Sequence, residues 1–361
     1  MIQSGTWIVR LMMLSALCMA VPSIEAQTLR TTDVPFRPDI RALGMGGAYV
    51  AAGRNGSAFL YNPALLVQSH TDVSIPFSLG TDDTARDLFK FIFDNKDSLS
   101  KFADLTSAGQ QKLYDGITPF DGEKTRLRIS PMFNIVMRNF GISAYGLVRA
   151  GVGIDKGIFE PRIQADGRSD IVVTIGAANY ITPKLAIGGN AKIVNSRFTS
   201  FDVRATEAET VTVGTVIDSL RKSNSGFAAD VGALYRLSGK TTLGFAIQDI
   251  YGKVGNAKYP VNVKAGIAWR SSRLTLAADL TDILNKDGVS VFNRVFMGGE
   301  LSLPFIQIRS GFYQGYPTAG AGINLKFIKL DYAYYRKEFS RRPGLDGRGQ
   351  HEIQGKIGWG W

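Results

Sequence analysis

The chain has 361 residues, including 40 glycines, 21 phenylalanines and 13 tyrosines, and its formal net charge is +11. Its mean hydropathy is close to zero and long apolar runs are missing, which excludes a bundle of membrane-spanning helices. The positive charge is spread along the chain and no nucleic-acid motif is present, so we expect no nucleic-acid partner.

Residues 1–26 have the pattern of a secretory signal peptide for Sec-dependent export. Arg10 precedes an apolar core at residues 11–21, and residues 24–26 end in a small residue suited to cleavage. The core is too short to act as a stop-transfer span, although a buried N-terminal helix is an alternative. Because Cys18 lies inside this segment, we expect the exported chain to have no disulfide and no thiolate metal site.

Residues 27–70 form neither a regular strand nor a clean helix. Closely spaced glycines allow backbone to approach backbone, and an Asn-Pro pair favours a turn. We interpret this segment as a plug inside, or at the mouth of, the barrel that the following strands form. The candidate plug or gate residues are Gly44, Gly46, Gly47, Asn62, Pro63 and Ala64.

The plug segment also carries a family resemblance. The run Arg41-Ala-Leu-Gly-Met-Gly-Gly-Ala-Tyr49, followed by Tyr61-Asn-Pro-Ala-Leu65, resembles the N-terminal hatch of the FadL-like (OMPP1/TodX-type) outer-membrane β-barrel superfamily. That superfamily includes the PorV/PorQ-type and TraF-like barrel proteins. The resemblance implies passive transport of hydrophobic or amphipathic small molecules, such as long-chain fatty acids. The alternative that it implies is a secretion or envelope-assembly barrel, which acts by protein–protein interaction.

Residues 84–115 change to a roughly helical spacing of apolar side chains. We expect a helical insertion in an extracellular loop. An amphipathic lid over a hydrophobic access site and a set of helices that only caps the barrel rim both fit this pattern. The candidate residues for ligand access are Leu88, Phe89, Ile92 and Phe102.

From Arg126 onward the apolar period is two. In residues 126–138, Leu127, Ile129 and Phe133 share one face while polar residues share the other, as in a strand between lipid and water. The pattern predicts an all-β fold, a transmembrane antiparallel barrel of about 14 strands over residues 71–361. The expected strands are 71–79, 126–138, 140–151, 170–180, 183–197, 226–237, 241–250, 260–270, 273–283, 292–303, 305–314, 319–326, 328–338 and 350–361.

The spacing between the predicted strands adds a second argument. Connections after every even-numbered strand are short, and those after odd-numbered strands are longer, as in outer-membrane barrels with a periplasmic side of tight turns. The chain also ends in an alternating segment that closes on Trp361, an aromatic suited to a membrane interface. A soluble β-sandwich would share the alternation but not the signal peptide or the loop asymmetry. We therefore expect the outer membrane of a Gram-negative bacterium.

Several inward strand positions carry basic residues, and the candidate lumen cations are Arg128, Lys264, Arg309 and Lys326. They could attract carboxylates, while loop cations could bind lipopolysaccharide phosphates. Alternatively, they are balanced by Asp230, Asp279, Glu300 and Asp331 on neighbouring strands. Neither of the two histidines is followed by a serine, and no metal-ligand cluster is present. We expect no enzyme activity, metal or cofactor, and as partners we expect membrane lipid, lipopolysaccharide, a hydrophobic ligand or secretion-system proteins.

Overall fold

The computed structural model describes residues 30–359 except 123, 211–222 and 326, so the expected signal peptide, Lys326 and Trp361 lie outside the described residues. The described chain forms one sheet of fifteen strands, of which β8 (Ala257–Lys258) pairs only with β7. Fourteen strands therefore make the wall. They are β1 (Asp72–Asp82), β2 (Lys124–Met137), β3 (Phe140–Asp155), β4 (Arg162–Tyr180), β5 (Leu185–Arg204), β6 (Asn224–Arg236), β7 (Thr241–Val254), β9 (Asn262–Arg270), β10 (Leu274–Leu280), β11 (Val295–Ser302), β12 (Ile306–Tyr313), β13 (Tyr316–Asn324), β14 (Ile328–Glu338) and β15 (Gly347–Trp359).

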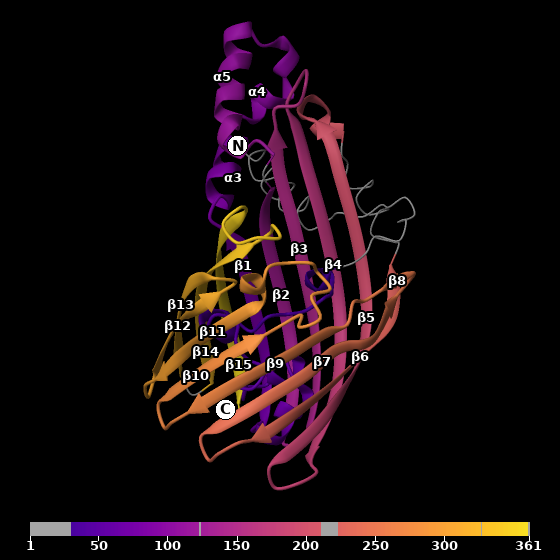
Figure 1. Ribbon diagram of the computed structural model, residues 1–361. Coiled ribbons are helices and arrows are strands. Elements are labelled where there is room, and N and C mark those ends of the chain that lie inside the picture. Colours follow the sequence, from indigo (N-terminus) through magenta and orange to yellow (C-terminus); the bar gives the residue numbers. More distant parts are fainter. Residues whose placement is uncertain (1–29, 123, 211–222, 326, 360–361) are drawn as a thin grey trace.

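The wall closes on itself as a barrel (Figure 1). Pairing between β6 and β7 joins the two ends of the strand order, and β1 pairs with β15, with Ile75 opposite Ile357. All of these pairs are antiparallel. Closure gives each wall strand a neighbour on both sides, which is what a sheet in a bilayer requires; the extension of β5 beyond Ser196 pairs with β4 alone. The predicted fold, an antiparallel barrel of about fourteen strands, is confirmed.

The side chains alternate as the sequence predicts. In β2, Ile129 is exposed on the outside and Ser130 is buried on the inside. In β15, Ile357 is 63% exposed, whereas Lys356 is 6% exposed. An apolar outer surface around a polar interior is the arrangement of a barrel whose wall faces lipid.

Short turns and long loops lie at opposite ends of the barrel. Turns of two to four residues join β2 to β3, β4 to β5, β6 to β7, β9 to β10, β11 to β12 and β13 to β14. The opposite end carries the longer connections, with one difference from the prediction. We expected residues 315–318 to link two strands, but only Gln314 and Gly315 separate β12 from β13. Both have positive φ, 54° and 84°, which makes a tight hairpin turn possible.

One side of the wall is taller than predicted. β3, β4 and β5 reach Asp155, Arg162 and Arg204, whereas the expected strands stopped at residues 151, 170 and 197. The ladder continues through this extension, with Val152 opposite Ala165. Glycines and charged residues in the extension resemble loop composition, which hid these strand ends from the sequence pattern.

The helices predicted for residues 84–115 are present. They are α3 (Ala85–Asp94), α4 (Lys96–Ser100) and α5 (Ser107–Ile117), with the 3₁₀ turns η4 (Phe102–Asp104) and η5 (Thr118–Phe120). Their apolar side chains form a cluster with Val152 and Ile154 of β3. These two residues share the strand face of Phe140, which is exposed on the outside, so the helices pack against the outer face of the tall wall (Figure 1). Within the described ranges, no helix has both the length and the apolar character needed to cross a bilayer.

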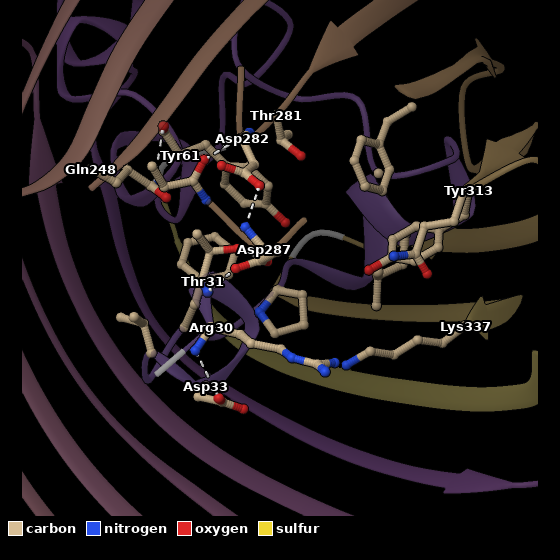
Figure 2. A pocket seen from close by; sticks show the side chains of 18 of the residues that line it. Arg30, Thr31, Asp33, Tyr61, Gln248, Thr281, Asp282, Asp287, Tyr313 and Lys337 are labelled. Carbon is tan, nitrogen blue, oxygen red and sulfur yellow. Dashed lines mark hydrogen bonds between the residues drawn. The ribbon is translucent and has the colours of Figure 1, made fainter. Parts of the chain in front are cut away.

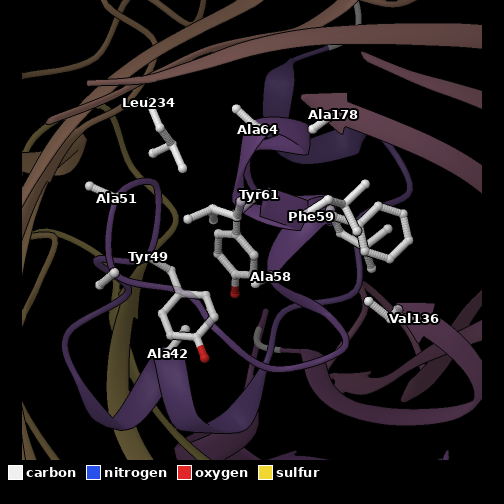
Figure 3. Packing of buried hydrophobic residues seen from close by; sticks show 14 of the residues in the cluster. Ala42, Tyr49, Ala51, Ala58, Phe59, Tyr61, Ala64, Val136, Ala178 and Leu234 are labelled. Atoms are coloured by element: carbon white, nitrogen blue, oxygen red, sulfur yellow. The ribbon is translucent and has the colours of Figure 1, made fainter. Parts of the chain in front are cut away.

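The N-terminal segment fills the barrel interior. It contains η1 (Thr31–Asp33), α2 (Ile40–Gly44), η2 (Ala58–Leu60) and η3 (Pro63–Gln68). Phe59, Leu65 and Leu66 are fully buried, in one cluster with inward residues of the strands. Figure 3 shows Phe59 and the neighbouring plug residues among Val136 and Leu234 of the wall. The plug therefore supplies the apolar core of a barrel whose own inner surface is largely polar.

Candidate functional site

Three glycines bring the plug into contact with the wall. Gly46 and Gly47 have φ values of +70° and +87°, a conformation that other residues rarely adopt. A Cβ atom on Gly46 would lie 2.2 Å from the carbonyl oxygen of Met297 in β11. Gly44 lies against Gly320 of β13, where an added Cβ would be 3.1 Å from that residue's Cα. These candidate gate residues therefore lie where the plug contacts the barrel wall.

The Asn62-Pro63-Ala64 turn fixes the other side of the plug. Asn62 accepts a hydrogen bond from the backbone N–H of Ala64 at 3.1 Å, which caps η3, and Pro63 occupies the first position of that turn. The Asn62 amide also donates to the carbonyls of Val50 in the plug, at 3.0 Å, and Ala233 in β6, at 3.2 Å. One buried side chain therefore joins two plug segments to the wall.

Buried charges tie the plug to the strands. Arg41 of α2 donates to both carboxylate oxygens of Glu300 in β11, at 2.6 and 2.7 Å. Arg309 of β12 binds the same carboxylate at 2.7 Å and also Asp331 of β14 at 2.7 Å. Asp279 of β10 accepts hydrogen bonds from backbone N–H groups of the plug. Of the acids expected to balance the lumen cations, Glu300 and Asp331 both pair with Arg309.

Asp39 organises the plug internally. Its carboxylate caps α2 by accepting from the N–H of Arg41 at 2.9 Å, and it also accepts from Asn55 at 2.6 Å and from Ser57. Burial raises the pKa of Asp39, but the hydrogen bonds from Ser57 and Asn55 and the charges of Arg37 and Arg41 outweigh it. The pKa therefore lies below its ordinary value and the group is ionised in the folded plug.

A cavity of about 620 Å³ lies in the lumen between the plug and the long-loop end of the barrel. Phe36, Leu60 and Tyr61 of the plug line one side. Figure 2 shows side chains of the N-terminal segment, the 281–294 loop and β14 projecting into the same space. The N-terminal segment is held at the cavity, because Thr31 donates to the carboxylate of Asp287 through its N–H at 2.7 Å and its hydroxyl at 2.5 Å.

The cavity wall is strongly polar. Lys192 of β5 pairs with Asp230 at 2.7 Å and with Asp249 at 2.5 Å. Lys264 of β9 is only 8% exposed, and its ammonium lies 5.2 Å from the centre of the Phe36 ring. A ligand in this cavity would contact aromatic rings and charged groups together.

The predicted lumen cations have different surroundings. Arg128 and Lys264 line the cavity, and Arg128 pairs with Glu352. Arg309 points inward but is buried in its ion pairs beside the plug, outside the cavity lining. Lys326 lies outside the described residues. Two of the four thus reach the space that a ligand could occupy.

Three of the four predicted access residues belong to the cluster between the helices and the tall wall. Leu88, Ile92 and Phe102 are buried there, and Phe89 is half-buried. A ligand could reach the three buried side chains only if the helices moved away from β3. Their role in ligand access stays a prediction.

Other cavity residues escaped the sequence analysis. Arg30 and Asp33 of the N-terminal segment and Lys337 of β14 all line the cavity. Arg37, which is outside the cavity lining, also escaped the sequence analysis; its side chain is 1% exposed and donates to Ser130 at 3.0 Å and to Gln354 at 2.8 Å. Alternate residues of β14 point into the lumen, so the strand pattern could have identified Lys337. No sequence signal distinguishes the residues that precede the hatch motif.

No group of three or more metal-ligating side chains occurs among the residues that the structure describes.

Comparison with known proteins adds the fold relatives. No protein-family model and no curated protein sequence matches the chain. Among solved structures, a deltaS2 mutant of the TodX monoaromatic hydrocarbon channel has a TM-score of 0.54 at 12% identity, over 89% of this chain and 98% of that one. The CymD monoaromatic hydrocarbon channel has a TM-score of 0.53 at 12% identity, over 89% and 97% of the two chains. The toluene transporter TodX of Pseudomonas putida has a TM-score of 0.51 at 12% identity, over 88% and 96%.

These matches span nearly the whole of both chains. Their low sequence identity limits what is shared to the fold, which includes the closed barrel and the N-terminal segment within it. The chain therefore has the fold of the FadL-like, TodX-type outer-membrane barrels, as its hatch motif predicts.

Proposed function

We propose that the chain is a passive channel for hydrophobic or amphipathic small molecules in the outer membrane of a Gram-negative bacterium. A ligand enters at the long-loop end, occupies the lumen cavity and passes when the plug rearranges. Burial of apolar ligand surface supplies the driving force, without a nucleotide or a redox cofactor.

The cavity beside the plug is the observation that carries this proposal. Its volume of about 620 Å³ is in the range of small-molecule pockets. Aromatic side chains from the plug and from the wall, including Phe36, Tyr61 and Phe296, line it. Because the plug forms part of the cavity wall, a movement of the plug would change the cavity at the same time.

The structural relatives support the same class of function. They are described as monoaromatic hydrocarbon channels and a toluene transporter. The secretion or envelope-assembly alternative gains no support from them. The exposed apolar belt on the strands supports lipid as the partner of the outer wall, and basic loop residues such as Arg341 and Arg342 support lipopolysaccharide as a partner at the rim.

Uptake through a loosened plug tests the proposal. In Asn62→Ala the plug loses its hydrogen bonds to Val50 and Ala233, so uptake of radiolabelled toluene or palmitate should rise severalfold over the wild type. The cells should lack their own hydrocarbon and fatty-acid transporters, and the variants should be compared at equal amounts of folded barrel.

Asn195→Ala is the matched control, because among the described residues the Asn195 amide bonds only to the hydroxyl of Ser225, at an exposed position. Its uptake should equal that of the wild type. If cells with the wild-type barrel take up neither compound faster than cells without it, and Asn62→Ala changes nothing, the transport function is wrong.

A further inference from the structure

Positively charged side chains from four separate segments line one part of the cavity. Arg30 comes from the N-terminal segment, Arg126 from β2, Arg149 from β3 and Lys337 from β14, and all four line the cavity. Figure 2 shows the side chains of Arg30 and Lys337 pointing toward one another across the cavity. Arg126 and Arg149 also act electrostatically on Lys337. Like charges therefore converge on one space.

Arg126 and Lys337 differ from several other cations of the lumen. Lys192, Arg309 and Arg128 each have a carboxylate partner within ion-pair distance. By contrast, no ion pair joins Arg126 or Lys337 to an acid anywhere in the described part of the chain. Converging like charges oppose folding unless a counter-charge joins them. The arrangement thus leaves room for an anion that the protein itself does not supply.

Three acids around this cluster already have other partners. Arg149 shares Asp170 with Arg168, at 2.9 and 3.0 Å, and the Nε of Arg149 has no partner among the described residues. Asp33 accepts from the backbone N–H of Arg30 at 2.9 Å. Glu338 accepts hydrogen bonds from several groups of its own loop, including Tyr316 at 2.7 Å.

An aromatic ring holds two of the free cations in place. The guanidinium of Arg126 lies 4.2 Å from the centre of the Phe339 ring, and the Lys337 ammonium lies 5.2 Å from it. Arg348 also faces this ring, at 5.5 Å. Such contacts orient a cation and leave its hydrogen-bond donors available. The donors of Arg126 and Lys337 can therefore reach a ligand in the cavity.

We infer that Arg30, Arg126, Arg149 and Lys337 form a binding site for the anionic group of an aromatic organic anion, such as an aryl phosphate. The ring of the ligand then lies deeper in the cavity, toward Tyr61. Guanidinium groups bind phosphate and carboxylate oxygens through paired hydrogen bonds, and the ammonium adds a point charge. This inference rests on the proposed channel function only in that the ligand reaches the site through the lumen.

Calorimetric titration of the full-length barrel in nanodiscs tests the site with three probes. They are 1-naphthyl phosphate, its neutral counterpart 1-methylnaphthalene, and inorganic phosphate. The aryl phosphate should bind most tightly, and its affinity should fall as salt is added. Lys337→Gln and Arg126→Gln should each weaken it about tenfold and leave 1-methylnaphthalene unchanged.

Lys240→Gln, in the exposed turn between β6 and β7, is the control and should leave every affinity unchanged. Folding of each variant is checked by its heat-modifiable gel mobility. If 1-methylnaphthalene binds as well as the aryl phosphate, the anion site is wrong while the channel function stands. If inorganic phosphate binds as tightly as naphthyl phosphate, the aromatic part of the inference is wrong. If no probe binds, both the site and the channel function fail.

Discussion

Glu300→Gln is the sharpest test of how the plug is held. The Glu300 side chain is 2% exposed and bridges Arg41 of the plug and Arg309 of the wall. Loss of one partner from a buried ion pair costs about 3–5 kcal/mol. Arg309 keeps Asp331, and Arg41 is 23% exposed, so we expect the lower end of that range. About 3 kcal/mol corresponds to a roughly hundredfold larger population of undocked plug.

Hydrogen–deuterium exchange of the amides in residues 40–66 measures that population, and single-channel conductance in planar bilayers reports whether undocking opens the lumen. Both signals should increase in Glu300→Gln. The control is Asp202→Asn, which breaks an exposed pair with Arg162 at 2.8 Å whose contribution to stability is small. Exchange and conductance that match the wild type in Glu300→Gln would refute an electrostatic anchor for the plug.

Three further substitutions test separate parts of the structure. Gly46→Ala should weaken plug docking by more than about 2 kcal/mol, because it adds both backbone strain and a clash with β11. Gly239→Ala, in an open turn, should cost less than about 1 kcal/mol. Amide exchange measures both effects. Asn62→Ala should weaken plug docking by about 1–3 kcal/mol in the same assay, and unchanged exchange would remove Asn62 from the plug contacts. Ile353→Lys on the lipid-facing surface should destabilise the folded barrel by about 2–4 kcal/mol in urea unfolding, while Ile158→Lys in the β3–β4 loop should have little effect; equal effects would contradict the assigned membrane surface.

The wall could be predicted because lipid and water act on alternate residues. That constraint applies along β2 and β15, where Ile129 and Ile357 face outward. The alternation between lipid and water does not apply in the extension of β3, because Val152 and Ile154 are buried under helices there. The tight β12–β13 turn was also missed, since Gln314 rarely adopts a positive φ.

The candidate gate residues could be placed at the plug from the motif, because the glycine and Asn-Pro positions follow from the local backbone conformation. Gly46 and Asn62 both lie at plug–wall contacts. The composition of the cavity could not be predicted, because it depends on which inward positions meet across the lumen. Arg30 and Lys337 come from opposite ends of the chain and face one another only after the barrel closes.

The pairing of β1 with β15 has a consequence for how the molecule is assembled. The plug ends at Gln68 and β1 begins at Asp72, so the plug is tethered directly beside the seam between the first and last strands. The seam can form only after β15 has been synthesised. The plug is therefore attached to one of the two strands that close the wall, and we expect a plug variant that docks poorly to slow closure as well as to alter the finished barrel.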